Sequence, residues 1–203
     1  MQGSRVLKFM LLMMLMPLAG CVTSPPSQTE NICKIFKEKD DWYSEALDSK
    51  RKWGSSIPTM MAFMYQESRF QPKAKPPRRK ILWVIPGPRK SSSYGFSQAK
   101  TATWDWYQKS SGNWGADRDD FGDAVDFIGW YNYQSKKRSK IALNDTYHLY
   151  LAYHEGHGGF NRRTFKKKGW LKQVARKVSG KAASYQKQLN GCESSLDRGW
   201  WFF

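Results

Sequence analysis

Apolar residues recur along this chain mainly at the three- and four-residue spacing of amphipathic helices, and alternating strand patterns are few. Glycines between Gly156 and Phe160 interrupt this spacing before it resumes. The spacing predicts a mainly helical domain, with helices over 41–53, 56–70, 101–110, 123–134 and 145–153, and one or two closing helices over 170–189.

The second predicted helix has no polar face over its central turns. Pro58 occupies an early helical position, where its missing N–H costs nothing. The run Met60-Met61-Ala62-Phe63-Met64-Tyr65 follows without a charged side chain. A helix that is apolar all round is buried, so we expect this helix in the core.

Residues 71–93 have a different composition from the rest of the chain. They contain five prolines and seven basic residues but no acidic residue. The apolar run Ile81-Leu82-Trp83-Val84-Ile85 predicts one short strand. We therefore expect a long loop or a small β-excursion beside the helices, and loops of this length are often functional.

The N-terminus has the pattern of a secretory signal. Arg5 and Lys8 give a basic start, residues 6–18 are otherwise apolar, and small residues lead to Cys21. Leu-Ala-Gly followed by this cysteine resembles a bacterial lipoprotein processing site, where the cysteine carries lipid and anchors the protein. Cleavage without lipidation, which gives a soluble exported protein, is the alternative. The residue after this cysteine is Val22 and not aspartate, which by resemblance to Gram-negative lipoproteins suits the outer membrane.

This pattern divides the chain into three parts. We expect a signal peptide over 1–20, a lipidated cysteine and flexible tether over 21–32, and one domain over 33–203. The expected location is the cell envelope, with the lipid holding the protein at the periplasmic face of the outer membrane.

Two cysteines remain after the lipidation site. Cys33 and Cys192 bracket almost the whole domain, and in an oxidising compartment such a pair favours a disulfide. Two unpaired thiols are the alternative, and a zinc site is poorly supported by two cysteines so far apart.

The formal net charge of +17 favours anionic partners. Nucleic acid is excluded because an exported protein seldom meets it and no binding module is present. Anionic envelope polymers, carboxylated peptide stems and lipid headgroups are nearer partners, although a basic surface also serves solubility alone.

Glu67 is the first candidate for chemistry. It lies one helical turn beyond Phe63 and Met64, which share its face of the helix. Apolar neighbours penalise the charged carboxylate and raise its pKa, as a proton donor near neutral pH requires. The alternative is a glutamate that is solvated or paired with Arg69.

Four sequence landmarks accompany this glutamate: Glu67-Ser68-Arg69-Phe70, Tyr94-Gly95-Phe96-Ser97-Gln98, Ala152-Tyr153-His154-Glu155-Gly156 and Tyr185. In this order and spacing they resemble the SLT-type lytic transglycosylases, which have a lysozyme-like α+β fold. The stretch from Gly54 through Phe70 also resembles the family's entry to its catalytic helix especially closely. The family usually has Gly-Leu-Met-Gln at the second landmark and Ala-Tyr-Asn-Ala-Gly at the third, so Phe96, His154 and Glu155 depart from the pattern.

The resemblance implies a monomeric enzyme that cleaves peptidoglycan glycan strands without water, metal or cofactor. Glu67 would act as general acid and then as base, giving 1,6-anhydromuramyl products. Ser68 would hold Glu67 or a substrate amide, Gln98 would contact a sugar, and Tyr153 and Tyr185 would position the acid. The remaining substrate contacts that the resemblance implies are Gly95, Phe96 and His154.

Three other functions compete with this interpretation. A lysozyme-type hydrolase needs a second carboxylate across the cleft, and Glu155 is the main candidate. A binding-only envelope lipoprotein suits the 15% aromatic content, since aromatic rings stack on pyranose faces. A zinc enzyme is poorly supported because His154 and His157 are three residues apart and glycines follow, whereas the zinc-protease motif places histidines four apart.

Overall fold

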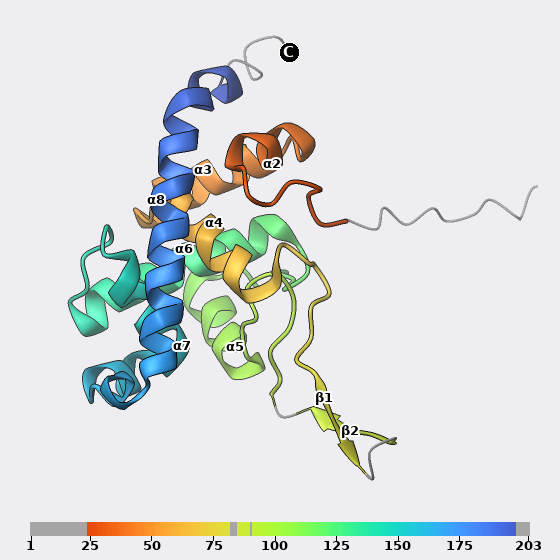
Figure 1. Cartoon of the computed structure of the whole chain (residues 1–203), viewed down its shortest axis with the longest axis vertical. Coiled ribbons are helices and arrows are strands. Elements are labelled where there is room, and N and C mark those ends of the chain that lie inside the picture. The colour runs from red at the N-terminus through yellow and green to blue at the C-terminus, as the bar shows by residue number, and fades with distance from the viewer. Residues whose placement is uncertain (1–23, 82–84, 90, 198–203) are drawn as a thin grey trace, which may run out of the picture.

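The computed structural model describes residues 24–81, 85–89 and 91–197 (Figure 1). Its elements are α2 (Ile32–Glu38), α3 (Trp42–Trp53), α4 (Ile57–Ser68), β1 (Arg78–Ile81), β2 (Ile85–Arg89), α5 (Thr101–Ser111), α6 (Phe121–Ser139), α7 (Thr146–Asn161), the 3-10 helix η1 (Thr164–Lys167) and α8 (Gly169–Asp197). The helices share one apolar core, which confirms the predicted mainly helical single domain. The predicted signal peptide and Cys21 lie outside the described residues.

Helix α4 is the buried helix that its sequence predicts. The Ser56 hydroxyl accepts a hydrogen bond from the Thr59 N–H and caps the helix, and Pro58 lies in its first turn. Every residue from Ile57 to Met64 is buried. The helix ends at Ser68 because Arg69 adopts a left-handed conformation. Glu67, in the last turn, is half-buried.

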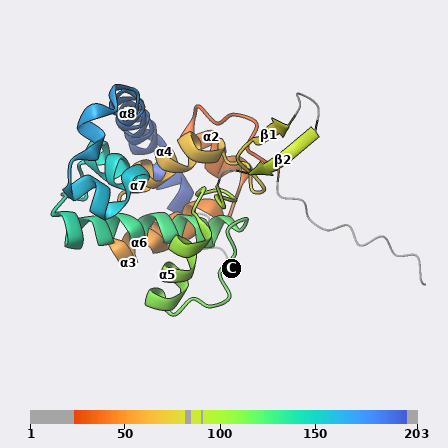
Figure 2. The ribbon, with the colours of Figure 1, turned by 90° about the horizontal axis from the view of Figure 1, so that it is seen from below.

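Helix α8 is one continuous helix, although its sequence allows one or two. It runs along the molecule and packs against α2, α4 and α7 (Figure 1). Helices α3 and α6 pack side by side on another part of the core, as the view from below shows (Figure 2). Within the described residues, no helix is both long and apolar enough to cross a membrane.

Helix α7 follows the predicted break only locally. Gly156 has φ 72° and ψ 155°, which kinks the chain, but helical structure resumes and reaches Asn161. Glycine suits this position because a side chain is strained at positive φ. Helix α7 packs against η1 and α8.

The β-excursion is a hairpin, and the prediction of one strand over 81–85 is wrong. Ile81 ends β1 and Ile85 begins β2, and the two residues pair in an antiparallel register. Residues 82–84, between them, lie outside the described part. The sequence pattern was misleading because residues 81–85 form an unbroken apolar run, in which no polar residue separates two strands. Two prolines fit β2 because each strand of a two-stranded ribbon has a free edge. The hairpin projects from the helical body (Figure 1).

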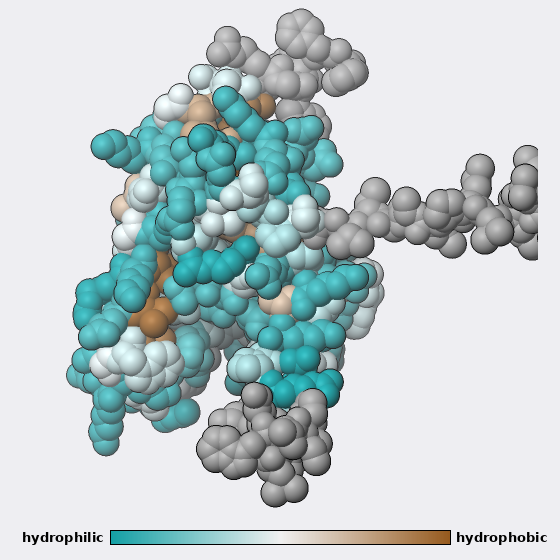
Figure 3. All heavy atoms as spheres, turned by 45° about the vertical axis from the view of Figure 1, so that its right-hand side comes forward, coloured by the Kyte–Doolittle hydropathy of each residue, from teal (hydrophilic) through white to brown (hydrophobic). Residues whose placement is uncertain are grey.

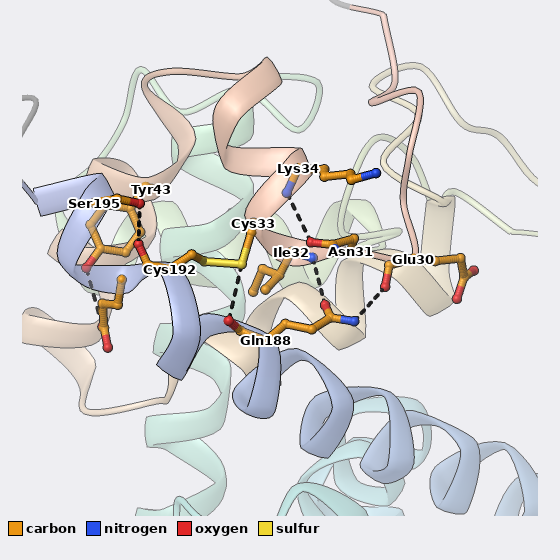
Figure 4. Close-up of a disulfide and its surroundings, with 10 residues drawn as sticks. Glu30, Asn31, Ile32, Cys33, Lys34, Tyr43, Gln188, Cys192 and Ser195 are labelled. Atoms are coloured by element: carbon orange, nitrogen blue, oxygen red, sulfur yellow. Dashed lines mark hydrogen bonds between the residues drawn. A yellow bond between two sulfur atoms is a disulfide. The ribbon is translucent and has the colours of Figure 1, made fainter.

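A disulfide joins Cys33 of α2 to Cys192 of α8, which confirms the predicted pairing (Figure 4). Gln188 of α8 reinforces this junction: its side-chain oxygen accepts a hydrogen bond from the Ile32 N–H at 3.0 Å. Its amide nitrogen donates to the Glu30 carbonyl at 3.2 Å. The short helix α2 is thus fixed to the end of the long helix.

Part of the predicted tether is attached to the domain. The Ser27 N–H and hydroxyl both donate to the Glu38 carboxylate. The Glu30 carboxylate accepts hydrogen bonds from Tyr65 and Lys181, on α4 and α8. In the structure the chain from Ser27 onward therefore follows the domain surface.

The described surface is mainly hydrophilic on the face that Figure 3 shows. This agrees with the composition of the chain, which has 34 lysines and arginines and 17 aspartates and glutamates. The charge lies on a solvated exterior, and the apolar residues are gathered in one core.

Removal of the disulfide should destabilise the domain. The bond joins residues 159 positions apart. In the chain-entropy model, such a loop contributes about 5 kcal/mol to the free energy of unfolding, and native strain lowers this value. We expect the Cys33→Ser/Cys192→Ser double variant to unfold at a clearly lower urea concentration. The fully reduced wild-type protein is the control and should match the variant. Equal unfolding midpoints for oxidised and variant protein would contradict the prediction.

Candidate active site

A pocket of about 410 Å³ lies beside the last turn of α4. Its walls come from α4, from the chain on both sides of the hairpin, from α5, and from the facing sides of α6 and α7. The lining residues are Glu67, Pro76, Ser91, Ser93, Gln98, Ala99, Lys100, Thr103, Phe127, Tyr131, Tyr153, His154, Glu155 and Gly156.

Glu67 occupies this pocket with one oxygen held by the protein. Its Oε1 accepts a hydrogen bond of 2.8 Å from the hydroxyl of Tyr150, which α7 supplies from across the core. The rings of Tyr150 and Tyr153 both meet the Phe63 ring edge-on, with centroids 5.2 Å apart in each case. The carboxyl group therefore lies among aromatic rings, on the side of the pocket that the apolar core forms.

These surroundings set the pKa of Glu67. Burial penalises the charged form and raises the pKa from 4.5 to about 7, while the hydrogen bond from Tyr150 opposes part of this rise. Arg69 does not compensate the charge, because its guanidinium lies 3.8 Å from the ring centroid of Tyr65. A substantial fraction of Glu67 is thus protonated at neutral pH.

Three of the other predicted site residues line the same pocket. Gln98 donates hydrogen bonds of 2.9 Å to the carbonyl groups of Ala74 and Gly95, so its amide shapes the loop wall. The Tyr153 hydroxyl donates to the Ser97 carbonyl at 2.6 Å. His154 lies on the α7 wall, two residues before the kink at Gly156.

Four predicted site residues do not line the pocket and instead build its surroundings. Ser68 donates back to the Met64 carbonyl within α4. Gly95 has φ 77°, and a Cβ there would lie 1.9 Å from the Arg118 carbonyl oxygen, so only glycine fits. Phe96 is fully buried against Trp42 and Phe121.

Tyr185 is the fourth of these residues. It is fully buried, and its hydroxyl donates to the Thr29 carbonyl. Its ring meets Tyr65 edge-on rather than the pocket. The tyrosine that contacts Glu67 is Tyr150, which sequence reasoning missed. Its position three residues before Tyr153 was the available signal, because residues at this spacing share one helix face.

Glu155 also lines the pocket, but its carboxylate is committed to other groups. Oε1 accepts hydrogen bonds from Lys168 at 2.7 Å and from His154 at 3.3 Å, and Oε2 accepts one from Thr164. Its side chain is only 3% exposed. Burial opposes the charge, but the three hydrogen bonds together hold the pKa of Glu155 below its usual value. Glu155 is therefore ionised, with both oxygens occupied.

His157 lies behind the pocket wall. Its ring stacks on Tyr131 with centroids 4.5 Å apart, and Nε2 lies 2.9 Å from the Ser135 hydroxyl. Burial, helped by the charge of the neighbouring Arg138, lowers the pKa of His157 to about 4. Among residues 24–81, 85–89 and 91–197, no three histidine, cysteine or acidic side chains are arranged to hold a metal ion.

The raised pKa of Glu67 predicts a pH-dependent stability difference for Glu67→Gln. The folded protein keeps a proton that the unfolded chain releases between pH 4.5 and about 7, so stability is lost as the pH rises through this interval. Glutamine avoids this loss and still accepts the Tyr150 hydrogen bond. From about pH 5 to about pH 8, the free energy of unfolding of the variant should rise relative to wild type by roughly 1–3 kcal/mol.

Urea unfolding of both proteins at the two pH values measures this difference. Other titrating groups, including Glu45 with its pKa raised to about 7 by burial, cancel because they are common to both proteins. A difference that does not change with pH would show that Glu67 titrates normally.

Comparison with known proteins agrees with this geometry. No curated protein matches the chain. The family described as the transglycosylase SLT domain matches residues 9–192, which contain all four sequence landmarks and every residue that lines the pocket. The family's activity is of the lytic transglycosylase type, on peptidoglycan. The match confirms the resemblance seen in the sequence: this chain belongs to the transglycosylase SLT domain family.

Proposed function

We propose that this protein cleaves the bond between N-acetylmuramic acid and N-acetylglucosamine in peptidoglycan, with Glu67 as both acid and base. One observation carries the proposal: the carboxyl group of the half-buried residue Glu67 lines the pocket, and burial raises its pKa to about 7. A general acid that must donate at neutral pH needs a pKa in this range. Family membership supports the substrate class.

The first step breaks the glycosidic bond. Protonated Glu67 donates its proton to the oxygen that links the two sugars, and the bonding electrons pass to this oxygen as its bond to the muramyl C1 breaks. The substrate's own N-acetyl group stabilises the positive charge that develops at C1, a substrate-assisted route that needs no protein nucleophile. Tyr150 holds Oε1 of Glu67 during this step, which leaves Oε2 to face the substrate.

The second step closes a ring. Glu67, now a carboxylate, removes the proton from the muramyl 6-hydroxyl, whose oxygen bonds to C1. The products are a 1,6-anhydromuramyl end and a free N-acetylglucosamine hydroxyl, and Glu67 regains its proton. A pKa near 7 serves both steps because the same group must give and then take a proton.

The state of Glu155 supports a mechanism with one carboxylate. Among the described residues that line the pocket, Glu155 is the only acid besides Glu67. A hydrolase of the inverting type needs its second carboxylate free to activate water. Both oxygens of Glu155 accept hydrogen bonds from neighbouring side chains, and Lys168 forms an ion pair with it. This carboxylate therefore links α7 to η1 and to the start of α8, and neither of its oxygens is free to activate a water molecule.

The products of purified peptidoglycan test this proposal. Mass spectrometry of the soluble fragments should show anhydromuropeptides with the wild-type protein. The Glu67→Gln variant should release at least about a thousandfold less, because it cannot donate a proton. Glu193→Gln is the matched control, since Glu193 bonds Tyr43 near the disulfide and does not line the pocket.

The control should retain wild-type products and yield. Muropeptides with reducing ends would assign the reaction to a hydrolase. Release of anhydromuropeptides by Glu67→Gln would remove this residue from the mechanism. Binding of peptidoglycan without any release would favour a binding protein over an enzyme.

A further inference from the structure

Trp170 is an exposed aromatic side chain at the start of α8. It is 55% exposed, and Trp114, at 70%, is the other large hydrophobic side chain that is so exposed among the described residues. An exposed indole ring does not contribute the free energy that its burial would supply. The residues around such a ring therefore help to show whether it serves to bind a partner.

The surroundings of Trp170 connect it to the active-site pocket. Its ring meets the ring of His154 nearly perpendicularly, with centroids 5.1 Å apart. His154, Glu155 and Gly156 form the α7 wall of the pocket. Trp170 therefore lies directly beside the pocket, with one edge against a lining residue and much of its surface open to solvent.

The base of Trp170 is fixed relative to the pocket. The Lys168 ammonium, two residues earlier in the chain, donates to Oε1 of Glu155 at 2.7 Å. Thr164 of η1 donates to the other oxygen of the same carboxylate. One buried, ionised side chain of the pocket wall thus holds both η1 and the beginning of α8. A binding group that is held in place before the ligand arrives loses less conformational entropy on binding.

Trp114 provides a comparison on the same molecule. It lies in the connection between α5 and α6, and its backbone carbonyl accepts a hydrogen bond from Gln108. It does not line the pocket, and within the described part of the chain its ring meets no aromatic ring of the pocket walls. Exposure alone is thus common to both tryptophans, and contact with the pocket wall distinguishes Trp170.

We propose that Trp170 and His154 form an additional saccharide subsite at the rim of the pocket, on its α7 side. The indole face would stack on the apolar C–H face of a pyranose ring of the glycan strand, and the imidazole would hydrogen-bond a hydroxyl or N-acetyl group of the same sugar. Glu155 is the positioning residue that holds the subsite against the pocket. This inference rests on the proposed function, because it assigns a further sugar of the same glycan strand to this protein.

Binding of a hexamer of N-acetylglucosamine tests the subsite without any turnover. The full-length protein carries Glu67→Gln as background, and titration calorimetry measures the dissociation constant. Adding Trp170→Ala should weaken binding about tenfold, which is the loss expected when one aromatic stacking surface is removed. Trp170→Tyr should restore most of the affinity, because it keeps a flat ring. Trp114→Ala is the matched control and should bind like the background protein.

The outcomes separate this inference from the proposed reaction. Both tryptophans are exposed, so urea unfolding midpoints should be unchanged and exclude misfolding as the cause of a loss. Equal affinities of Trp170→Ala and Trp114→Ala, or no binding of the hexamer by any variant, would overturn the subsite. A shift of tryptophan fluorescence that anionic lipid vesicles cause, that Trp170→Ala abolishes and that the hexamer does not cause would also overturn it, in favour of a membrane contact. The cleavage assay with the wild-type protein decides the proposed reaction independently.

Discussion

The burial of the Glu67 carboxyl group is the constraint on which the rest of this structure depends. Helix α4 is buried from Ile57 to Met64, and its only acid lies in the last turn. The aromatic rings of Phe63, Tyr150 and Tyr153 surround this position. A general acid with this pKa needs apolar surroundings and access to the substrate. Helix α4 provides the apolar surroundings, and the pocket provides the access.

Some landmark residues line the pocket, and others hold the pocket walls in place. Glu67, Gln98, Tyr153 and His154 line the pocket. Gly95 and Phe96 instead fix the loop that carries Gln98, because the glycine approaches the Arg118 carbonyl and the phenylalanine fills the core beneath it. A sequence pattern therefore records both the groups that contact a ligand and the packing that holds them in place. Residues of the second kind shape the pocket without facing it.

Much of this fold follows from the sequence. The apolar run of α4 identifies the central helix, and the pair Cys33 and Cys192 identifies the disulfide. The short helix α2 gave no comparable signal, because seven residues contain too few turns to show a helical period. The hairpin was predicted as one strand because residues 81–85 form one unbroken apolar run. One-dimensional patterns identify long elements better than short ones.

The candidate site was predictable only in part, for a different physical reason. Glu67 is recognisable from its own helix, since Phe63 and Met64 precede it by one turn. Tyr150 lies 83 residues away and meets Glu67 only because α7 packs beside α4. The environment of Glu155 likewise depends on Lys168 and Thr164, which η1 and α8 bring to it. Contacts between helices that are distant in the sequence leave no periodic signal in either helix.

The titration of Glu67 tests the central claim most directly. Carbon-13 NMR of the side-chain carboxyl, with Glu67→Gln to assign its signal, measures the pKa in the intact protein. The account predicts a pKa of about 7, because burial among aromatic rings outweighs the hydrogen bond from Tyr150. A pKa near the ordinary value of 4.5 would mean that Glu67 is fully ionised at neutral pH, and it would contradict the assignment of this residue as the general acid.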